Sequence, residues 1–237
     1  MKKYVAEATI IIRIGLIGMR DEYLETIINC PLFNGIGKKN LEEAVSLLKG
    51  RIKEFPKGHT FTHYEDRISA AGIVLSGCVE GTFLNEGFDE VSMNRFSKGM
   101  MFGEALACIE KNRSPMEIKA VEDTVVLFVA LKEIYCNPAN SPLQFVLAKN
   151  LIESLAEKNQ FLNMKVRLFS QKSLRDRILM YLSTLPKNKD GYSVLPFNKT
   201  ELASFLCVNR SALSRELGRL QDEKLILISG RNIKITV

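Results

Sequence analysis

Four residues near the C-terminus have the types and spacing that could read a nucleic acid. Arg210 and Ser211 are adjacent, and Ser214 and Arg215 follow them four residues later, so on a helix the four share one face over two turns. An Arg can bind both acceptors of a guanine edge, and small hydroxyl residues beside it can hydrogen-bond to bases. This pattern predicts a helix whose first turns lie in the major groove of DNA.

Such a helix needs a second helix to hold it, and the preceding segment supplies one. Asn198 can cap a helix that begins at Lys199, and Glu201 can reach back to the cap nitrogen, which gives a capping box with Asn in place of Ser or Thr. Cys207 lies in a short turn, and Asn209 can cap the helix that follows. Two helices separated by about three residues are typical of a helix-turn-helix motif.

The segment after the second helix, LILISGRNIKITV, predicts a two-stranded hairpin with a glycine near its turn. A hairpin in this place would be the wing of a winged helix-turn-helix. Arg231 and Lys234 in the wing, together with Lys199 at the start of the first helix, are expected to contact phosphates. Thr200 beside Lys199 is expected to contact DNA as well.

The formal charge is divided unevenly along the chain. Residues 165–237 hold 14 Lys and Arg against 6 Asp and Glu, whereas residues 1–164 hold 19 against 21. The C-terminal part is therefore +8 and the rest is −2, within a net charge of +6. A basic region of this kind is expected to meet a polyanion such as double-stranded DNA.

Composition places the chain among ordinary globular proteins. It has 237 residues, of which 46% are hydrophobic and 25% charged, which excludes a disordered or fibrous chain. Its five cysteines include no C-x-x-C pair, so no disulfide framework is expected. This use of cysteine is typical of a reducing compartment, and we expect a cytoplasmic location.

The N-terminal segment is not expected to meet a membrane. The apolar run at 8–18 contains Arg13 and is about half a membrane span, so no membrane partner is expected. Residues 1–21 are expected to be an N-terminal extension with little role in the fold.

The rest of the chain divides by its apolar periodicity. Helical spacing predicts two short amphipathic helices at 23–33 and 41–48. Over residues 52–129, short β-rich runs alternate with glycines, which predicts an antiparallel sandwich or barrel. A long helix is predicted from 142 to about 169, and a further amphipathic helix at 173–185.

The long helix carries apolar residues at heptad spacing, which predicts a seam between two copies of the chain. The expected a and d positions are Ala148, Leu151, Leu155, Leu162 and Phe169, with Lys158 and Lys165 at the remaining d positions. The alternative is a helix that packs only on its own domain.

The order of these elements and the segment TELASFLCVNRSALSREL resemble the catabolite activator protein and Fnr family over about residues 22–237. The resemblance implies an α+β fold with a cyclic-nucleotide-binding-like double-stranded β-helix (22–138), a dimerisation helix (139–169) and a winged helix-turn-helix (170–237). It also implies an effector-responsive, sequence-specific DNA-binding transcription regulator. As a homodimer it would bind a pseudo-palindromic site and work with RNA polymerase.

The resemblance assigns roles in the helix-turn-helix as well. By position, Arg210, Ser211 and Arg215 fall where that family contacts bases. Ser211 stands where the best-known members often carry Glu, so their target sequence does not transfer to this chain. Cys207 stands in place of a turn glycine.

An effector cassette is the second implication of the resemblance. Gly103 and Glu104 would begin it, with Glu104 on a ribose hydroxyl, and Arg113 and Ser114 would neutralise a cyclic phosphate. However, Arg113 is about one residue out of register with the nucleotide-binding members. A cyclic nucleotide, a different small effector, and a plain turn with a solvated Glu104 carboxylate all stay open.

The long helix bears on the same question. Leu162 and Asn163 stand where the nucleotide-binding members offer hydroxyl groups to the base. These two residues are therefore the expected contribution of the helix to the effector site.

Other chemistries have less support. No closely spaced cysteines suit an iron–sulfur cluster, and His59 and His63 fit strand positions better than axial ligands, so no metal or haem is expected. A redox thiol switch stays open. No nucleophile–base pair, P-loop or H-E-x-x-H occurs, so an enzyme is not expected. The alternative function is a small-molecule or cyclic-nucleotide sensor module whose winged helix binds a protein partner.

Overall fold

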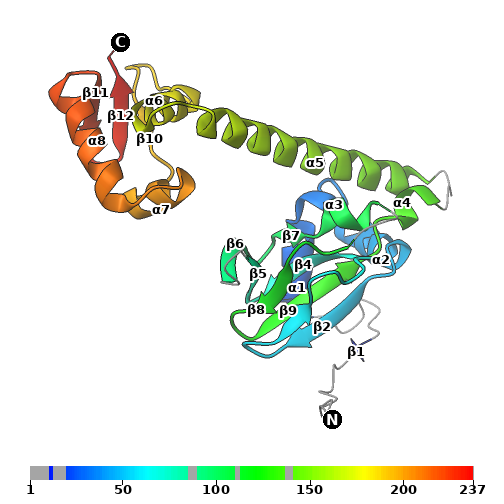
Figure 1. Cartoon of the computed structure of the whole chain (residues 1–237). Helices are drawn as coiled ribbons and strands as arrows, with labels where there is room; N and C mark the ends of the chain where they lie inside the picture. The colour runs from blue at the N-terminus through cyan, green and yellow to red at the C-terminus, as the bar shows by residue number, and fades with distance from the viewer. Residues whose placement is uncertain (1–10, 13–19, 85–89, 110–112, 137–140, 237) are drawn as a thin grey trace, which may run out of the picture. The chain divides into compact units, whose positions relative to one another are not determined.

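The computed structural model describes residues 11–12, 20–84, 90–109, 113–136 and 141–236 (Figure 1). The chain forms two compact units, residues 1–156 and residues 157–237, and the boundary between them falls inside a long helix. Each unit is described below by itself.

The first unit begins with short helices where the apolar spacing predicts them. They are α1 (Asp21–Ile28), the 3-10 turn η1 (Pro31–Phe33) and α2 (Lys38–Leu47). Their apolar faces, including Ile27, Leu32 and Leu41, are fully buried in the main core of the unit. The burial of one face of each short helix stabilises elements that are too short to persist alone.

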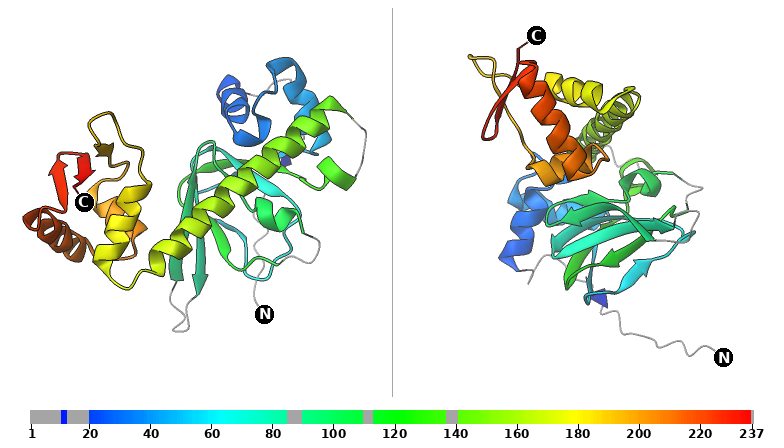
Figure 2. Two further views of the ribbon diagram at one scale, coloured as in Figure 1. Left: turned by 90° about the horizontal axis from the view of Figure 1, so that it is seen from above. Right: turned by 60° about the vertical axis from the view of Figure 1, so that its left-hand side comes forward.

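Antiparallel strands build the rest of this unit, as predicted. Their bounds are β1 (Ile11–Ile12), β2 (Arg51–Phe55), β3 (Thr60–Thr62), β4 (Ala71–Ser76), β5 (Cys78–Leu84), β6 (Glu90–Ser97), β7 (Met101–Phe102), β8 (Glu117–Ala120) and β9 (Thr124–Val129). Within the described residues, the sheet orders are β1-β2-β9-β4-β7 and β3-β8-β5-β6. Figure 2 shows that these strands pack together in layers as a single β-domain.

The N-terminal extension differs from the expectation at two residues. Ile11 and Ile12 pair with Lys53 and Ile52 at the edge of the first sheet. Backbone hydrogen bonding to β2 therefore includes these two residues in the fold, although they lie far from β2 in the sequence.

An aromatic cluster fills the space between the sheets. The Phe55 ring stacks on Phe61 with centroids 4.1 Å apart, and Phe102 lies 6.2 Å from Phe61 and 6.4 Å from Phe128. Gly72 lies against this cluster, since a Cβ there would be 2.1 Å from Cζ of Phe102. Only glycine lets β4 approach the Phe102 ring this closely.

Two short helices, α3 (Glu104–Ala107) and α4 (Glu133–Cys136), lead to the long helix α5 (Pro142–Phe169). The N-terminal half of α5 packs Leu147 and Leu151 into the main core of the first unit. Its buried Asn150 donates from Nδ2 to the carbonyl oxygens of Leu32 (3.0 Å) and Asn34 (2.8 Å). These bonds satisfy a polar group that would otherwise be costly to bury.

The exposed face of α5 has a different register from the predicted seam. Leu151 is only 6% exposed because it belongs to the core, whereas Ile152 and Val166 are 66% and 63% exposed. A 3-4 spacing that includes the exposed apolar residues runs through Phe145, Ala148, Ile152, Leu155, Asn159, Leu162, Val166 and Phe169, which we call the α5 stripe. The prediction of a seam position was therefore wrong for Leu151, which the core covers. Lys165, at another predicted d position, donates to Phe205 O of its own chain. The position of Lys158 in the seam stays a prediction.

The second unit contains the elements predicted for a winged helix-turn-helix. They are α6 (Leu174–Thr184), β10 (Ser193–Val194), α7 (Lys199–Phe205), α8 (Arg210–Asp222), β11 (Ile226–Ser229) and β12 (Asn232–Ile235). The strands pair in the order β10-β12-β11. The core of the second unit is a hydrophobic cluster of its own, which includes Leu202, Leu206, Leu213, Leu217 and Leu220. Among the helices described, none is long and apolar enough to cross a membrane.

Candidate nucleic-acid interface and effector cassette

The first helix of the motif starts with the predicted capping box. Asn198 Oδ1 accepts from the backbone N–H groups of Thr200 and Glu201, both at 2.9 Å. Glu201 Oε2 accepts from the backbone N–H of Asn198 at 2.8 Å. These reciprocal bonds fix the start of α7 and leave the side chains of Lys199 and Thr200 exposed at its N-terminus.

The turn between the helices is closed by backbone hydrogen bonds around Cys207. The N–H of Cys207 donates to Ser204 O (3.0 Å), and the N–H of Val208 donates to Ala203 O (2.9 Å), which is a Schellman motif. Cys207 has a φ of +53°, in the left-handed region that favours glycine. The structure thus explains why a glycine is expected at this position.

The second helix presents the four predicted reading residues on one face. Asn209 caps α8 by accepting from the N–H of Ala212 at 2.7 Å. On the face opposite the core, Arg210, Ser211 and Arg215 are exposed and Ser214 is half-buried. The structure therefore brings Arg210, Ser211, Ser214 and Arg215 together at the N-terminal end of α8.

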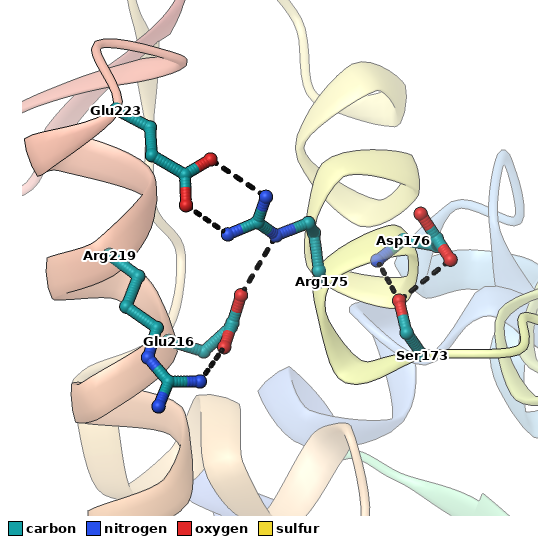
Figure 3. Close-up of polar contacts among 6 residues, drawn as sticks. All are labelled: Ser173, Arg175, Asp176, Glu216, Arg219 and Glu223. Carbon is teal, nitrogen blue, oxygen red and sulfur yellow. Dashed lines mark hydrogen bonds and ion pairs between the residues drawn. The ribbon is translucent and has the colours of Figure 1, made fainter.

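An ion-pair network that sequence reasoning missed holds α8 against α6 (Figure 3). Arg175 of α6 donates from Nε to Glu216 at 3.0 Å and from both Nη atoms to Glu223, at 2.7 and 2.5 Å. Arg219 contacts the other Glu216 oxygen at 3.4 Å. Because Arg175 donates to it, the pKa of the Glu223 carboxyl lies below its ordinary value of 4.5, and the pKa of Arg175 is raised in return. The network fixes the helix and neutralises its carboxylates.

The two wing cations have partners inside their own unit. Arg231 donates from Nε and Nη2 to Leu195 O (3.1 and 2.9 Å), and from Nη2 to Pro196 O at 2.8 Å. Lys234 Nζ donates to Asp190 O at 2.9 Å. These bonds hold the wing to the segment around β10, so any phosphate contact must use the N–H groups that remain.

The cassette begins with the expected backbone geometry. Gly103 has a φ of +72°, and Glu104 follows as the first residue of α3. The Glu104 side chain is buried, with only 6% of the residue exposed. The alternative of a plain turn with a solvated Glu104 carboxylate is therefore wrong.

The two predicted phosphate ligands have partners within the chain. Ser114 is 1% exposed, and its hydroxyl donates to Met116 O. Arg113 is exposed, donates from Nη1 to Glu65 O at 3.0 Å, and has its Nε 3.6 Å from a Glu65 carboxylate oxygen. A cyclic phosphate could still accept from the N–H groups of Arg113 that remain, but the Ser114 hydroxyl would have to leave Met116 O to donate to it. Residues 110–112 of the cassette lie outside the described residues.

The predicted helix contribution belongs to the other unit. Leu162 and Asn163 are exposed on α5, and Asn163 Nδ2 donates to Asn159 Oδ1 at 2.7 Å. Gly103, Glu104, Arg113 and Ser114 lie in the first unit, whereas Leu162 and Asn163 lie in the second.

Two of the cysteines, Cys78 and Cys108, are poor candidates for thiolate chemistry. All five cysteines are free, and burial raises the pKa of the Cys78 and Cys108 thiols, which keeps both protonated at neutral pH. In the part of the chain that the structure describes, no three His, Cys, Asp or Glu residues gather in a way that could hold a metal ion.

Comparison with known families assigns both units. Residues 176–237 match the Crp-like helix-turn-helix domain, and residues 52–135 match the cyclic nucleotide-binding domain. The chain belongs to the Crp/Fnr family. It is a DNA-binding transcription regulator of the Crp/Fnr type with an effector-binding domain. This confirms the family resemblance and the α+β fold with a β-rich N-terminal domain, long helix and C-terminal helix-turn-helix.

Solved structures of the family have the same fold. The catabolite activator protein of Thermus thermophilus aligns with a TM-score of 0.52 at 23% identity, over 86% of this chain and 93% of its own. A CooA variant from Carboxydothermus hydrogenoformans aligns with a TM-score of 0.51 at 18% identity, over 81% and 86%. No curated protein sequence matches this Crp/Fnr chain.

Proposed function

We propose that this Crp/Fnr chain acts in the cytoplasm as a homodimer, without catalytic activity of its own, and regulates transcription in response to a small effector. The observation that carries the homodimer is the α5 stripe, in which every position except Asn159 is apolar. Phe145, Ile152 and Val166 are exposed. If a second copy covers them, the dimer is stabilised by roughly 25 cal/mol for each Å² of apolar surface removed from water. Heptad spacing is the pattern that two parallel helices bury.

Two copies of α8 would then bind a pseudo-palindromic duplex. We propose that Arg210, Ser211, Ser214 and Arg215 contact base edges and that Lys199 and Thr200 contact phosphates. Arg231 and Lys234 primarily hold the wing in place, and contribute to phosphate binding through their remaining N–H groups. Recognition helices about 34 Å apart fit successive major grooves on one face of DNA.

For the effector, we propose a small molecule other than a cyclic nucleotide. The support is the internal pairing of buried Ser114, because a cyclic phosphate would have to displace the contact between its hydroxyl and Met116 O. We place the effector near Gly103 and Glu104 of the first unit. Its binding would shift the population between two packings of the α5 stripe and so change the spacing of the α8 helices.

The effector proposal is tested by calorimetric titration with cyclic AMP and cyclic GMP. We expect no heat of binding at millimolar nucleotide. Saturable binding that Ser114→Ala or Arg113→Ala abolishes would contradict the proposal and assign the cassette to a cyclic nucleotide.

The DNA proposal is tested by mobility shifts with duplexes selected from a random pool, at several salt concentrations. Each phosphate contact lowers log affinity by about 0.9 per unit of log salt, so we expect a steep slope. A flat response would favour the alternative, in which the winged helix binds a protein partner.

RNA polymerase is the further partner that we propose for the DNA-bound dimer.

A further inference from the structure

Lys165, which heptad spacing assigned to a dimer seam, instead contacts the helix-turn-helix of its own chain. Its Nζ donates to the carbonyl oxygen of Phe205 at 3.0 Å. The same ammonium lies 4.1 Å from the centroid of the Phe205 ring, and 5.8 and 5.5 Å from the rings of Phe161 and Phe169. A half-buried cation between aromatic faces gains both hydrogen-bond and cation–π energy. Lys165 therefore joins the C-terminal half of α5 to the last residue of α7.

A second cation, from α6, reaches the same helix end. Arg177 donates from Nη1 to Leu206 O at 2.9 Å, and its guanidinium carbon lies 5.4 Å from the centroid of the Phe169 ring. Carbonyl groups in the last turn of a helix lack intrahelical partners and carry the negative end of the helix dipole. Positive groups at this point both satisfy the carbonyls and stabilise the helix. We call Lys165, Arg177 and the two carbonyl groups the α7 clamp.

Phe169 belongs to both the α5 stripe and the surroundings of the clamp. It is partly exposed on α5, and both Lys165 and Arg177 lie over its ring. A second copy that packed on the α5 stripe would contact this ring. A change in that packing would then act on the two cations that hold the end of α7.

We propose that Lys165 is a positioning residue, which fixes α7, and through the short turn α8, to the end of the α5 stripe. The spacing of the two recognition helices then follows the packing of α5 in the dimer. This inference rests on the proposed homodimer, and Lys165 itself is expected to contact no DNA.

The first test compares Lys165→Met, which keeps the length of the side chain and removes its charge, with Lys165→Arg and the matched control Lys158→Met. The probes are a palindromic duplex selected by the wild-type protein and the same duplex with one half-site scrambled. We expect Lys165→Met to weaken palindrome binding about tenfold with little change at the half-site, since one charged hydrogen bond is lost. The salt slope should stay unchanged, and Lys165→Arg should restore affinity.

Equal losses on both duplexes, a smaller salt slope, or the same effect from Lys158→Met would overturn the proposal. The first outcome would mean that Lys165 only stabilises the motif, and the second that it contacts phosphate. Circular dichroism melts of each variant separate these outcomes from loss of folding.

A second test needs neither DNA nor dimerisation. Spin labels are introduced as unnatural amino acids at exposed Glu157 of α5 and Asp222 of α8, in labelled protein diluted with unlabelled protein. The distance distribution within one chain should broaden in Lys165→Met but not in Lys158→Met. An unchanged width would overturn the clamp, whatever the protein binds. If DNA binding fails in the wild type but the broadening appears, the proposed function is wrong and the clamp stands.

Discussion

At the scale of single residues, the reading face of α8 separates two kinds of contact. Arg215 is exposed on the outward face of α8, whereas Lys199 is exposed at the start of α7. Arg215 therefore suits a base edge, because α8 enters the groove. Lys199 suits a phosphate, because phosphates flank that groove.

Arg215→Ala should therefore cost about 1–3 kcal/mol of binding free energy and relax the base preference at one position of the site. Lys199→Ala should weaken binding to all sequences alike and reduce the salt slope by about one contact. Mobility shifts on a panel of single-base variants measure both. Identical profiles for the two substitutions would show that the assignment is wrong.

Cys207 carries backbone strain that a glycine would remove. An L-residue in the left-handed region costs about 1–2 kcal/mol, and the larger entropy of glycine in the unfolded chain offsets part of that. We expect Cys207→Gly to raise the free energy of unfolding by about 0.5–1 kcal/mol, and Cys207→Ala, which keeps a Cβ, to give no such gain. Urea denaturation distinguishes them, and equal stabilities would show that the +53° φ is not strained.

Gly72 and Gly218 form a contrasting pair. A Cβ at Gly72 would overlap the Phe102 ring, whereas at Gly218 in α8 it would meet nothing within 4 Å. Gly72→Ala should destabilise the chain by about 1–3 kcal/mol, and Gly218→Ala should stabilise it by about 1 kcal/mol. The same denaturation assay measures both, and a neutral Gly72→Ala would mean that the aromatic cluster moves aside freely.

At the scale of elements, the recognition helix depends on contacts that lie outside itself. Its apolar face is buried by Leu213, Leu217 and Leu220, and its acidic groups are tied to Arg175 of α6. Sequence periodicity predicted the buried face because the three leucines repeat along one helix. It did not predict the Arg175 network, since Arg175 and Glu223 are separated by 48 residues.

The depressed pKa of Glu223 makes this contact dependent on pH. A carboxyl whose folded-state pKa lies below its ordinary value contributes stability above that value, and loses it as pH falls through the folded-state pKa. Wild type should therefore be more stable than Glu223→Gln at neutral pH, and the difference should shrink as pH falls below about 4.5. Thermal melts from pH 3 to pH 7, a range of about four units around the carboxyl pKa, would show this.

Exposed Glu157 on α5 offers a matched control, since Glu157→Gln removes a carboxylate without touching the network. A pH-independent difference between wild type and Glu223→Gln would mean that the ion pair adds nothing to stability.

At the scale of the whole molecule, the α5 stripe decides whether two copies associate. Val166→Asp places a charge on an otherwise uncharged face in both copies at once. Loss of apolar burial worth about 1.5 kcal/mol or more in each copy should weaken association by at least about a hundredfold. Sedimentation at micromolar concentration should show a monomer, and palindrome binding should fall with it.

Gln160→Asp, at an exposed position of α5 outside the stripe, is the matched control and should stay dimeric. A Val166→Asp dimer of wild-type stability would place the interface on another surface of the chain.

The sequence alone determined the features that depend on near neighbours. The capping box at Asn198, the cap at Asn209 and the short turn at Cys207 involve residues within five positions of each other, so they follow from local spacing. The spacing of apolar residues is also a local property, and it distinguishes the β-rich segment from the helices.

Only the tertiary structure decided which face of α5 is covered and which carbonyl groups Lys165 and Arg177 bind. Leu151 and Ile152 are adjacent and equally apolar, yet one is buried and the other exposed, because the core of the first unit covers one side of the helix. Lys165 meets Phe205 across 40 residues. Contacts of this kind depend on how distant segments pack, and the pattern of any one segment does not contain that information.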